Sequence, residues 1–256
     1  MPPEFFPPRL GSVHYLNGAP LTFGLDDQMR FTTPARLAEL LRQEKLDAAL
    51  VSITEVLFHN RYDILDGVAI ASRGEVYSVL LAHKKPLAQV REVYCDTASL
   101  TSLNLLKVLL AERGLQPRFL PLESYAAAAD KDFVLLIGDP AIDFQRSPHP
   151  HQIFDLGTEW FNREQLPFVF AVWALRRGVD QKANRRLLRA AKTNGLNHLE
   201  QIIRQRPEHD EAFRRAYFER NIRYELNGEE KRGIARFCEL LQKHGLGPVF
   251  PPQFST

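Results

Sequence analysis

Short apolar segments alternate with helical segments along the first two thirds of the chain, and this alternation constrains the fold more than any other feature. Buried strands are predicted over residues 46–51, 64–72 and 75–82. Before the first of these strands, Thr32 or Thr33 can cap a helix that has Pro34 in its first turn. Strand–helix–strand order argues for a parallel or mixed sheet with helices on both faces, so we expect an α/β fold.

A second unit of the same kind begins after Pro86. Its predicted strands cover residues 90–96, 118–120, 132–137 and 153–156. A leucine-rich amphipathic helix is predicted over 100–113, and Gly114 ends it. The chain therefore carries two successive α/β units rather than one.

The remainder, from Asp180 to Gly245, is almost entirely helical in pattern, with breaks expected near Asn194-Gly195, Pro207 and Asn227-Gly228. Two α/β units and a helical C-terminal segment predict two lobes with a ligand cleft between them. Lobe 1 is expected to comprise residues 1–84 plus 175–256, and lobe 2 residues 85–174. Two strands, Tyr77–His83 and Phe168–Ala174, are expected to cross between the lobes. A single continuous domain is the alternative.

Composition and charge narrow the function classes. Hydrophobic residues make up 45% of the 256 residues and charged residues 25%, which is typical of a globular protein. The start of the chain shows no signal-peptide pattern, and no apolar run approaches the roughly 20 residues that span a bilayer. Cys95 and Cys238 do not make a disulfide framework. We therefore expect a cytoplasmic protein without a membrane partner.

Positive charge is concentrated in residues 176–256, where 17 Lys and Arg stand against 10 Asp and Glu. The arginines there alternate with Glu and Leu at helical spacing, as in Glu229–Lys243, and this is typical of a solvated helix face. No aromatic RNA-binding pattern or zinc knuckle accompanies them, so a nucleic-acid partner is not expected.

Polar residues follow four of the predicted strands. Asn17 is the first, at a sharp Asn17-Gly18 turn that ends the strand Arg9–His14. Because open α/β sheets bind ligands at the carboxyl ends of their strands, Asn17 is a candidate ligand-binding residue. A turn that is merely capped by Asn17 is the structural alternative.

The other three clusters are Ser52-Ile53-Thr54-Glu55, Asp96-Thr97-Ala98-Ser99-Leu100-Thr101-Ser102 and Ile137-Gly138-Asp139-Pro140-Ala141. The second of these opens the helix of the second unit, where hydroxyls and free N–H groups suit a carboxylate or phosphate. Plain capping by Ser99 explains the same residues. In the last cluster, Gly138 permits close approach of a ligand to the backbone, and Asp139 can cap a helix.

Conventional catalytic signatures are absent from the sequence. It has no nucleophile elbow, phosphate-binding loop, dinucleotide fingerprint or zincin motif. His149 and His151 lack further ligands for a metal, so neither a metal nor a cofactor is expected. On these residues alone, the chain is a two-lobed binder of a small anion.

Gly11-x-Val13-x-Tyr15-Leu16-Asn17-x-x-Pro20-Leu21 resembles the opening of chorismate dehydratases, the first enzymes of the futalosine route to menaquinone. Further matches follow in the family's order: Asp47-Ala48-Ala49-Leu50-Val51-Ser52, Gly74-Glu75-Val76-Tyr77-Ser78-Val79, Ser99-x-Thr101-Ser102, Ile137-Gly138-Asp139 and Leu166-Pro167-Phe168-Val169-Phe170-Ala171-x-Trp173. A sibling enzyme, which cleaves cyclic dehypoxanthine futalosine, has Cys-Pro-Asn-Asp-Thr where this chain has Tyr15–Ala19, which favours the dehydratase.

The resemblance implies a type II periplasmic-binding-protein-like fold and a reaction in which chorismate loses water to give 3-[(1-carboxyvinyl)oxy]benzoate. It implies Asn17 and Ser78 as catalytic residues. The substrate-binding residues that it implies are Tyr15, Leu16, Ser52, Glu55, Ser99, Thr101, Ser102, Gly138 and Asp139. A homodimer is left open.

In the family picture, the enolpyruvyl carboxylate of the substrate itself removes the proton, and the enzyme orients it. An amide such as that of Asn17 does not titrate, and Ser78 is a weak base without a histidine partner. The alternative is a protein base, for which His14, Glu55 and Asp139 are the candidates. A non-catalytic binding protein of the same fold is the competing class.

Overall fold

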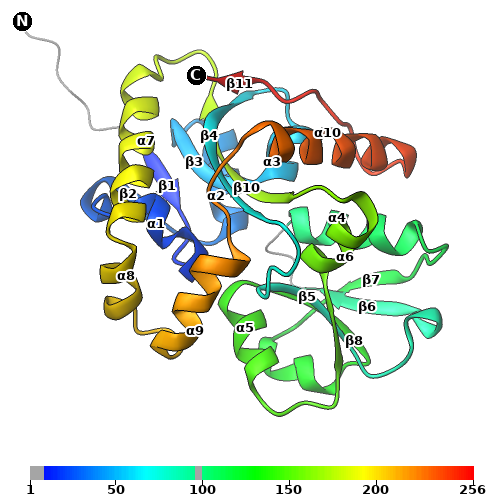
Figure 1. Ribbon diagram of the computed structural model, residues 1–256. Helices are drawn as coiled ribbons and strands as arrows, with labels where there is room; N and C mark the ends of the chain where they lie inside the picture. Colours follow the sequence, from blue (N-terminus) through cyan, green and yellow to red (C-terminus); the bar gives the residue numbers. More distant parts are fainter. Residues whose placement is uncertain (1–8, 96–99) are drawn as a thin grey trace, which may run out of the picture.

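A computed structural model describes residues 9–95 and 100–256. It contains two β-sheets, each with helices packed against it (Figure 1). The six-stranded sheet has the order β11-β4-β10-β3-β1-β2, with bounds Phe254–Ser255, Tyr62–Ser72, Phe168–Arg176, Ala48–Ser52, Leu10–Ser12 and Met29–Phe31. The five-stranded sheet has the order β7-β6-β8-β5-β9, with bounds Arg118–Pro121, Glu92–Cys95, Phe133–Ile137, Val79–His83 and Gln152–Asp155. Both sheets mix parallel and antiparallel pairs, as expected for this class.

The α-helices follow the predicted alternation and then fill the C-terminal segment. They are α1 (Ala19–Thr22), α2 (Pro34–Arg42), α3 (Ile53–Phe58), α4 (Leu100–Ala111), α5 (Gly138–Arg146), α6 (Leu156–Glu164), α7 (Lys182–Asn197), α8 (Leu199–Gln205), α9 (Glu211–Ala216) and α10 (Gly228–Lys243). Helix α2 begins as predicted, because the Thr33 side chain accepts a hydrogen bond from the Arg36 N–H and Pro34 occupies the first turn.

Two connections pass between the sheets: the segment from β4 to β5, and the one from β9 through α6 to β10. These are the two expected crossings. Strand β5 pairs within the five-stranded sheet and β10 within the six-stranded sheet. A division of the chain by sheet would assign β5 to lobe 2 and β10 to lobe 1. The expected bounds, residues 1–84 plus 175–256 and residues 85–174, place β5 in lobe 1 and most of β10 in lobe 2.

The helical segment departs from the prediction at one point. A break was expected at Asn194-Gly195, but α7 continues through both residues. A Cβ atom at Gly195 would collide with the Pro20 carbonyl, so glycine is present there because α7 and α1 approach each other closely. The expected breaks at Pro207 and Asn227-Gly228 are confirmed, and the Asn227 N–H donates to the Glu230 side chain at the start of α10.

Helices α7 to α9 run along one side of the six-stranded sheet, and α9 ends beside α5 (Figure 1). The chain then passes through a π-helical turn, Tyr217–Asn221, before α10 returns to pack against β10 and α4. The C-terminal segment therefore reaches both the six-stranded sheet and helix α4. No helix in the described part of the chain combines the length and the apolar character needed to cross a membrane.

Candidate active site

A cavity of about 80 Å³ lies between the two sheets, and we call it the interlobe cavity. Its polar lining residues are Tyr15, Asn17, Ser52, Ser78 and Ser102, and its apolar wall includes Val13, Leu50, Ile70, Ile137, Phe170 and the Gly138 backbone. These residues come from the ends of β1, β3 and β8, from β4, β10 and α4, and from the segment before β5. Of its five polar lining residues, three come from the predicted strand-end clusters: Asn17, Ser52 and Ser102.

Asn17 lies in a single 3₁₀ turn, Leu16–Gly18, which follows β1 and leads into α1. The Gly18 N–H closes this turn on the Tyr15 carbonyl at 2.9 Å. The Asn17 carbonyl accepts a hydrogen bond from the Tyr224 hydroxyl at 2.9 Å. With its backbone fixed at both points, the Asn17 amide is held at the cavity.

Ser78 is fully buried and precedes β5. Its hydroxyl oxygen accepts a hydrogen bond from the Tyr217 hydroxyl at 2.8 Å, and its own hydroxyl donates a longer bond to the Val76 carbonyl at 3.4 Å. Its backbone carbonyl accepts from the Gly138 N–H at 2.7 Å, because β5 and β8 pair so that Val79 lies opposite Ile137. Ser78 and Gly138 are thus neighbours through sheet register.

The backbone before Ser78 depends on one buried carboxylate. Asp155 accepts hydrogen bonds from the N–H groups of Val76 at 3.1 Å, Tyr77 at 2.8 Å and Thr158 at 2.8 Å. Tyr77 has a φ of 64°, a left-handed conformation that a non-glycine residue adopts only when its surroundings hold it there. Burial raises the pKa of Asp155, and the three N–H donors oppose this rise. Asp155 therefore positions Ser78 from a distance.

Gly138 opens α5 with a φ of 63° and lies under the Tyr15 ring. A Cβ atom at Gly138 would come within 3.1 Å of the Tyr15 ring, so a side chain would be strained both by conformation and by contact. The next residue, Asp139, accepts a hydrogen bond from the Leu16 N–H at 3.2 Å. Burial raises the pKa of Asp139. Residues 138 and 139 thereby join the two sheets at the cavity.

The remaining predicted residues divide into two groups. Ser52 and Ser102 line the interlobe cavity. Thr101 instead links α4 to α3. Its hydroxyl accepts a hydrogen bond from the Thr54 N–H and donates one to the Thr54 hydroxyl, both at 3.1 Å. Ser99 lies outside the described residues, together with 96–98.

Glu55, Leu16 and His14 do not line the cavity. Both carboxylate oxygens of Glu55 accept from one terminal nitrogen of Arg42 at 2.8 Å, so this buried charge is already neutralised. The Leu16 side chain is buried in the hydrophobic core. His14 is stacked on Phe31 in a different cavity, described below. Glu55 and His14, two of the three candidate protein bases, therefore face other partners.

Among the described residues that line the interlobe cavity, Tyr15 is the one with a titratable side chain. The others offer amide, hydroxyl and backbone groups, which donate and accept hydrogen bonds without changing charge at ordinary pH. Such a site orients a ligand and stabilises developing charge, but leaves proton removal to the ligand itself or to a residue beyond this lining. No group of three or more His, Cys, Asp or Glu side chains suited to a metal ion occurs in the described ranges.

Residues 8–243 match the model of a protein family described as "Menaquinone biosynthesis". The chain belongs to this family. A chorismate dehydratase from Thermus thermophilus is 35% identical to it, over 96% of this chain and 97% of that protein. The resemblance in the sequence motifs is therefore confirmed over nearly the whole length.

The fold of this family member is similar to the folds of several solved structures. Protein AF1704 from Archaeoglobus fulgidus has a TM-score of 0.74 at 15% identity, over 93% of this chain and 97% of that one. The periplasmic aliphatic sulphonate-binding protein from Escherichia coli has a TM-score of 0.63 at 15% identity, over 97% and 93% of the two chains. The expected periplasmic-binding-protein-like fold is confirmed.

Sequence reasoning missed two residues of the site, Tyr217 and Tyr224, which contact Ser78 and Asn17 from the C-terminal segment. Both are buried, and burial raises the pKa of each well above its usual range, so each stays a protonated donor. Tyr217 lies in the π-helical turn, a feature that is often found at functional sites. Nothing in the local sequence pattern distinguishes these tyrosines from core residues.

Proposed function

We propose that this protein is a hydro-lyase that converts chorismate to 3-[(1-carboxyvinyl)oxy]benzoate, in the cytoplasm and without a cofactor. The observation that carries the proposal is the 35% identity to a chorismate dehydratase over almost all of both chains. The site chemistry agrees with it. Loss of the proton at C3 and of the hydroxyl at C4 makes the ring aromatic, so the protein needs to hold and orient the substrate rather than supply a strong base.

The lining of the interlobe cavity suits a reaction in which the protein orients the substrate and does not supply a strong base. We assign to Asn17 and Ser78 the hydrogen bonds that orient the ring and the internal carboxylate, and to Ser52 and Ser102 the binding of substrate oxygens. The enolpyruvyl carboxylate removes the proton, because the described lining holds no carboxylate or imidazole. Tyr217 acts through Ser78 as a positioning residue.

We propose that the sheets separate to enlarge the cavity for the substrate. A volume of about 80 Å³ is well below the roughly 300–1,000 Å³ of ordinary ligand pockets. Few polar contacts cross between the sheets at this point, and they include Leu16 to Asp139 and Thr54 to Thr101. We propose that these contacts open when substrate enters and re-form around it, by a hinge at the two connecting segments.

Incubation of the purified protein with chorismate tests the proposal. The expected result is loss of chorismate and the appearance of an aromatic product of the mass of chorismate minus water. A binding protein without activity gives a thermal shift but no product, which would refute the enzymatic proposal. Turnover of cyclic dehypoxanthine futalosine in place of chorismate would assign the chain to the sibling activity.

A further inference from the structure

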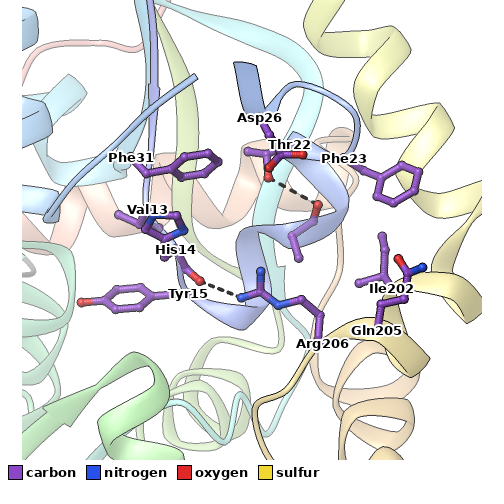
Figure 2. A pocket seen from close by; sticks show the side chains of 11 residues that line it. Val13, His14, Tyr15, Thr22, Phe23, Asp26, Phe31, Ile202, Gln205 and Arg206 are labelled. Atoms are coloured by element: carbon purple, nitrogen blue, oxygen red, sulfur yellow. Dashed lines mark hydrogen bonds between the residues drawn. The ribbon is translucent and has the colours of Figure 1, made fainter. Parts of the chain in front are cut away.

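A second cavity, of about 200 Å³, lies on the other side of the Tyr15 segment, and we call it the α8 cavity. It is lined by residues from the end of β1, from α1, from the strand β2 and from the end of α8 (Figure 2). At about 30 Å³ for each water, this volume corresponds to about seven water molecules, the scale of an amino acid rather than of a drug-sized ligand. The proposed reaction makes no use of this cavity.

The walls of the α8 cavity are aromatic and aliphatic. His14 and Phe31 are stacked on one side, with ring centroids 4.2 Å apart and an interplanar angle of 20°. Phe23 and the buried Ile202 form the facing wall (Figure 2). A flat or aliphatic ligand body would find apolar contact on both sides.

One end of the cavity carries a fixed cation. The Arg206 guanidinium donates from Nη2 to the His14 carbonyl at 2.9 Å, and its Nε and Nη2 both donate to the carboxylate of Glu208 in a bidentate ion pair, with Nε at 3.0 Å. Its other terminal nitrogen, Nη1, donates to no described residue and points toward the cavity interior (Figure 2). Two N–H groups in a fixed orientation are thus available to a carboxylate.

The other end carries an anion. Asp26 lines the cavity, and it forms no ion pair and accepts no side-chain hydrogen bond within the described chain. Figure 2 shows Asp26 and Arg206 at opposite ends of the cavity, with Phe31 and His14 on one flank and Phe23 and Ile202 on the other.

We propose that the α8 cavity binds a small zwitterion: a molecule of amino-acid size with one ammonium group, one carboxylate and an apolar body. The carboxylate pairs with Nη1 of Arg206, the ammonium with Asp26, and the body lies between Phe31 and Phe23. Val13 and Tyr15 line both the α8 cavity and the interlobe cavity. A ligand in the α8 cavity therefore contacts residues that also form the wall of the interlobe cavity. The site is separate from the substrate site and regulatory in character.

Isothermal titration calorimetry on the full-length protein tests this, with L-phenylalanine and para-aminomethylbenzoate as zwitterions, which differ in charge spacing. Phenylacetate and benzylamine, each lacking one charge, are the comparison ligands. We expect saturable binding of at least one zwitterion, about tenfold or more tighter than both singly charged analogues. Binding should weaken as salt is added, because both charges are partly exposed.

Asp26→Asn should weaken zwitterion binding by about three- to fivefold, the size of one exposed ion pair, and leave phenylacetate binding unchanged. The matched control is Asp27→Asn, since Asp27 is an exposed neighbour outside the cavity lining. Equal affinities in the two variants, no binding of either zwitterion at about 10 mM, or equally tight binding of benzylamine would each overturn the proposal. Purely competitive inhibition of chorismate turnover by the bound zwitterion would place it in the interlobe cavity instead and overturn the separate site.

Discussion

Replacement of Tyr217 by Phe removes one hydroxyl from beneath the proposed catalytic Ser78 and leaves the ring in place. That hydroxyl donates to Ser78 at 2.8 Å in a fully buried setting, and the remaining contact of the Ser78 hydroxyl, to Val76, is long at 3.4 Å. A buried neutral hydrogen bond contributes about 0.5–1.5 kcal/mol to stability, so the midpoint of thermal unfolding should fall by about 2–5 °C in a chain of this size.

The catalytic effect should be larger than the stability effect suggests. Without Tyr217 the Ser78 oxygen loses its donor at 2.8 Å and keeps only the longer contact to Val76, so its position beside the substrate is less fixed. We therefore expect kcat to fall by about tenfold and KM to change little. Ser78→Ala should lower kcat by about 100-fold, the scale of a lost oriented polar contact. In the double variant, Tyr217→Phe should add less than it does alone, because part of its effect passes through Ser78 and part through the Asn17 side chain.

Tyr62→Phe is the matched control for Tyr217→Phe. Tyr62 is also buried, with a pKa raised to about 12 by burial, and its hydroxyl has no hydrogen-bond partner within the described residues. Its removal should leave kcat unchanged and stability equal or higher, since no buried bond is lost. Steady-state kinetics and thermal unfolding of both variants make the comparison. A wild-type kcat in Tyr217→Phe, or additive losses in the double variant, would refute the positioning role.

Three further variants test other parts of the site. Asn17→Ala should lower kcat by about 100-fold without changing the shape of the pH–rate profile, because the amide does not titrate; a lost limb of the profile would implicate a protein base. Gly138→Ala should lose about 1–3 kcal/mol of unfolding free energy by chemical denaturation and raise KM, since the left-handed backbone and the nearby Tyr15 ring both oppose a Cβ atom; unchanged stability would contradict this. Asp139→Asn tests the pH dependence of stability. Burial raises the pKa of Asp139 in the folded state. The contribution of Asp139 to stability is therefore fully present below its ordinary pKa near 4 and is lost as the pH rises through the raised pKa. The stability of the wild type relative to Asp139→Asn should therefore decline as the pH rises. An increase in this relative stability with pH would contradict the prediction.

Local rules predicted the parts of this protein that depend on a few neighbouring residues. Thr33 and Pro34 start α2 because a cap and a fixed φ act within one turn. The strand-end rule brought Asn17, Ser52 and Gly138 to one cavity, because sheet geometry places strand ends together.

Long-range packing decided what the sequence could not predict. Gly195 has the appearance of a helix break, yet its glycine serves the contact between α7 and Pro20, 175 residues earlier in the chain. Glu55 lies in the first turn of α3, and its pairing with Arg42 is visible only once α2 and α3 are brought together. Tyr217 is separated from Ser78 by 139 residues, and no periodicity reveals such a contact.

The arrangement of the site explains how a binding-protein fold can support catalysis without an acid–base pair. The proposed catalytic groups Asn17 and Ser78 are anchored by Tyr224 and Tyr217, two protonated donors from the C-terminal segment, which packs against the six-stranded sheet and α4. The proposed hinge closure would bring the anchored groups together with the Gly138 backbone, which lines the same cavity, around one ligand. A reaction in which the substrate carries its own base needs this ordered enclosure above all, since its barrier is lowered by alignment rather than by proton transfer to the protein.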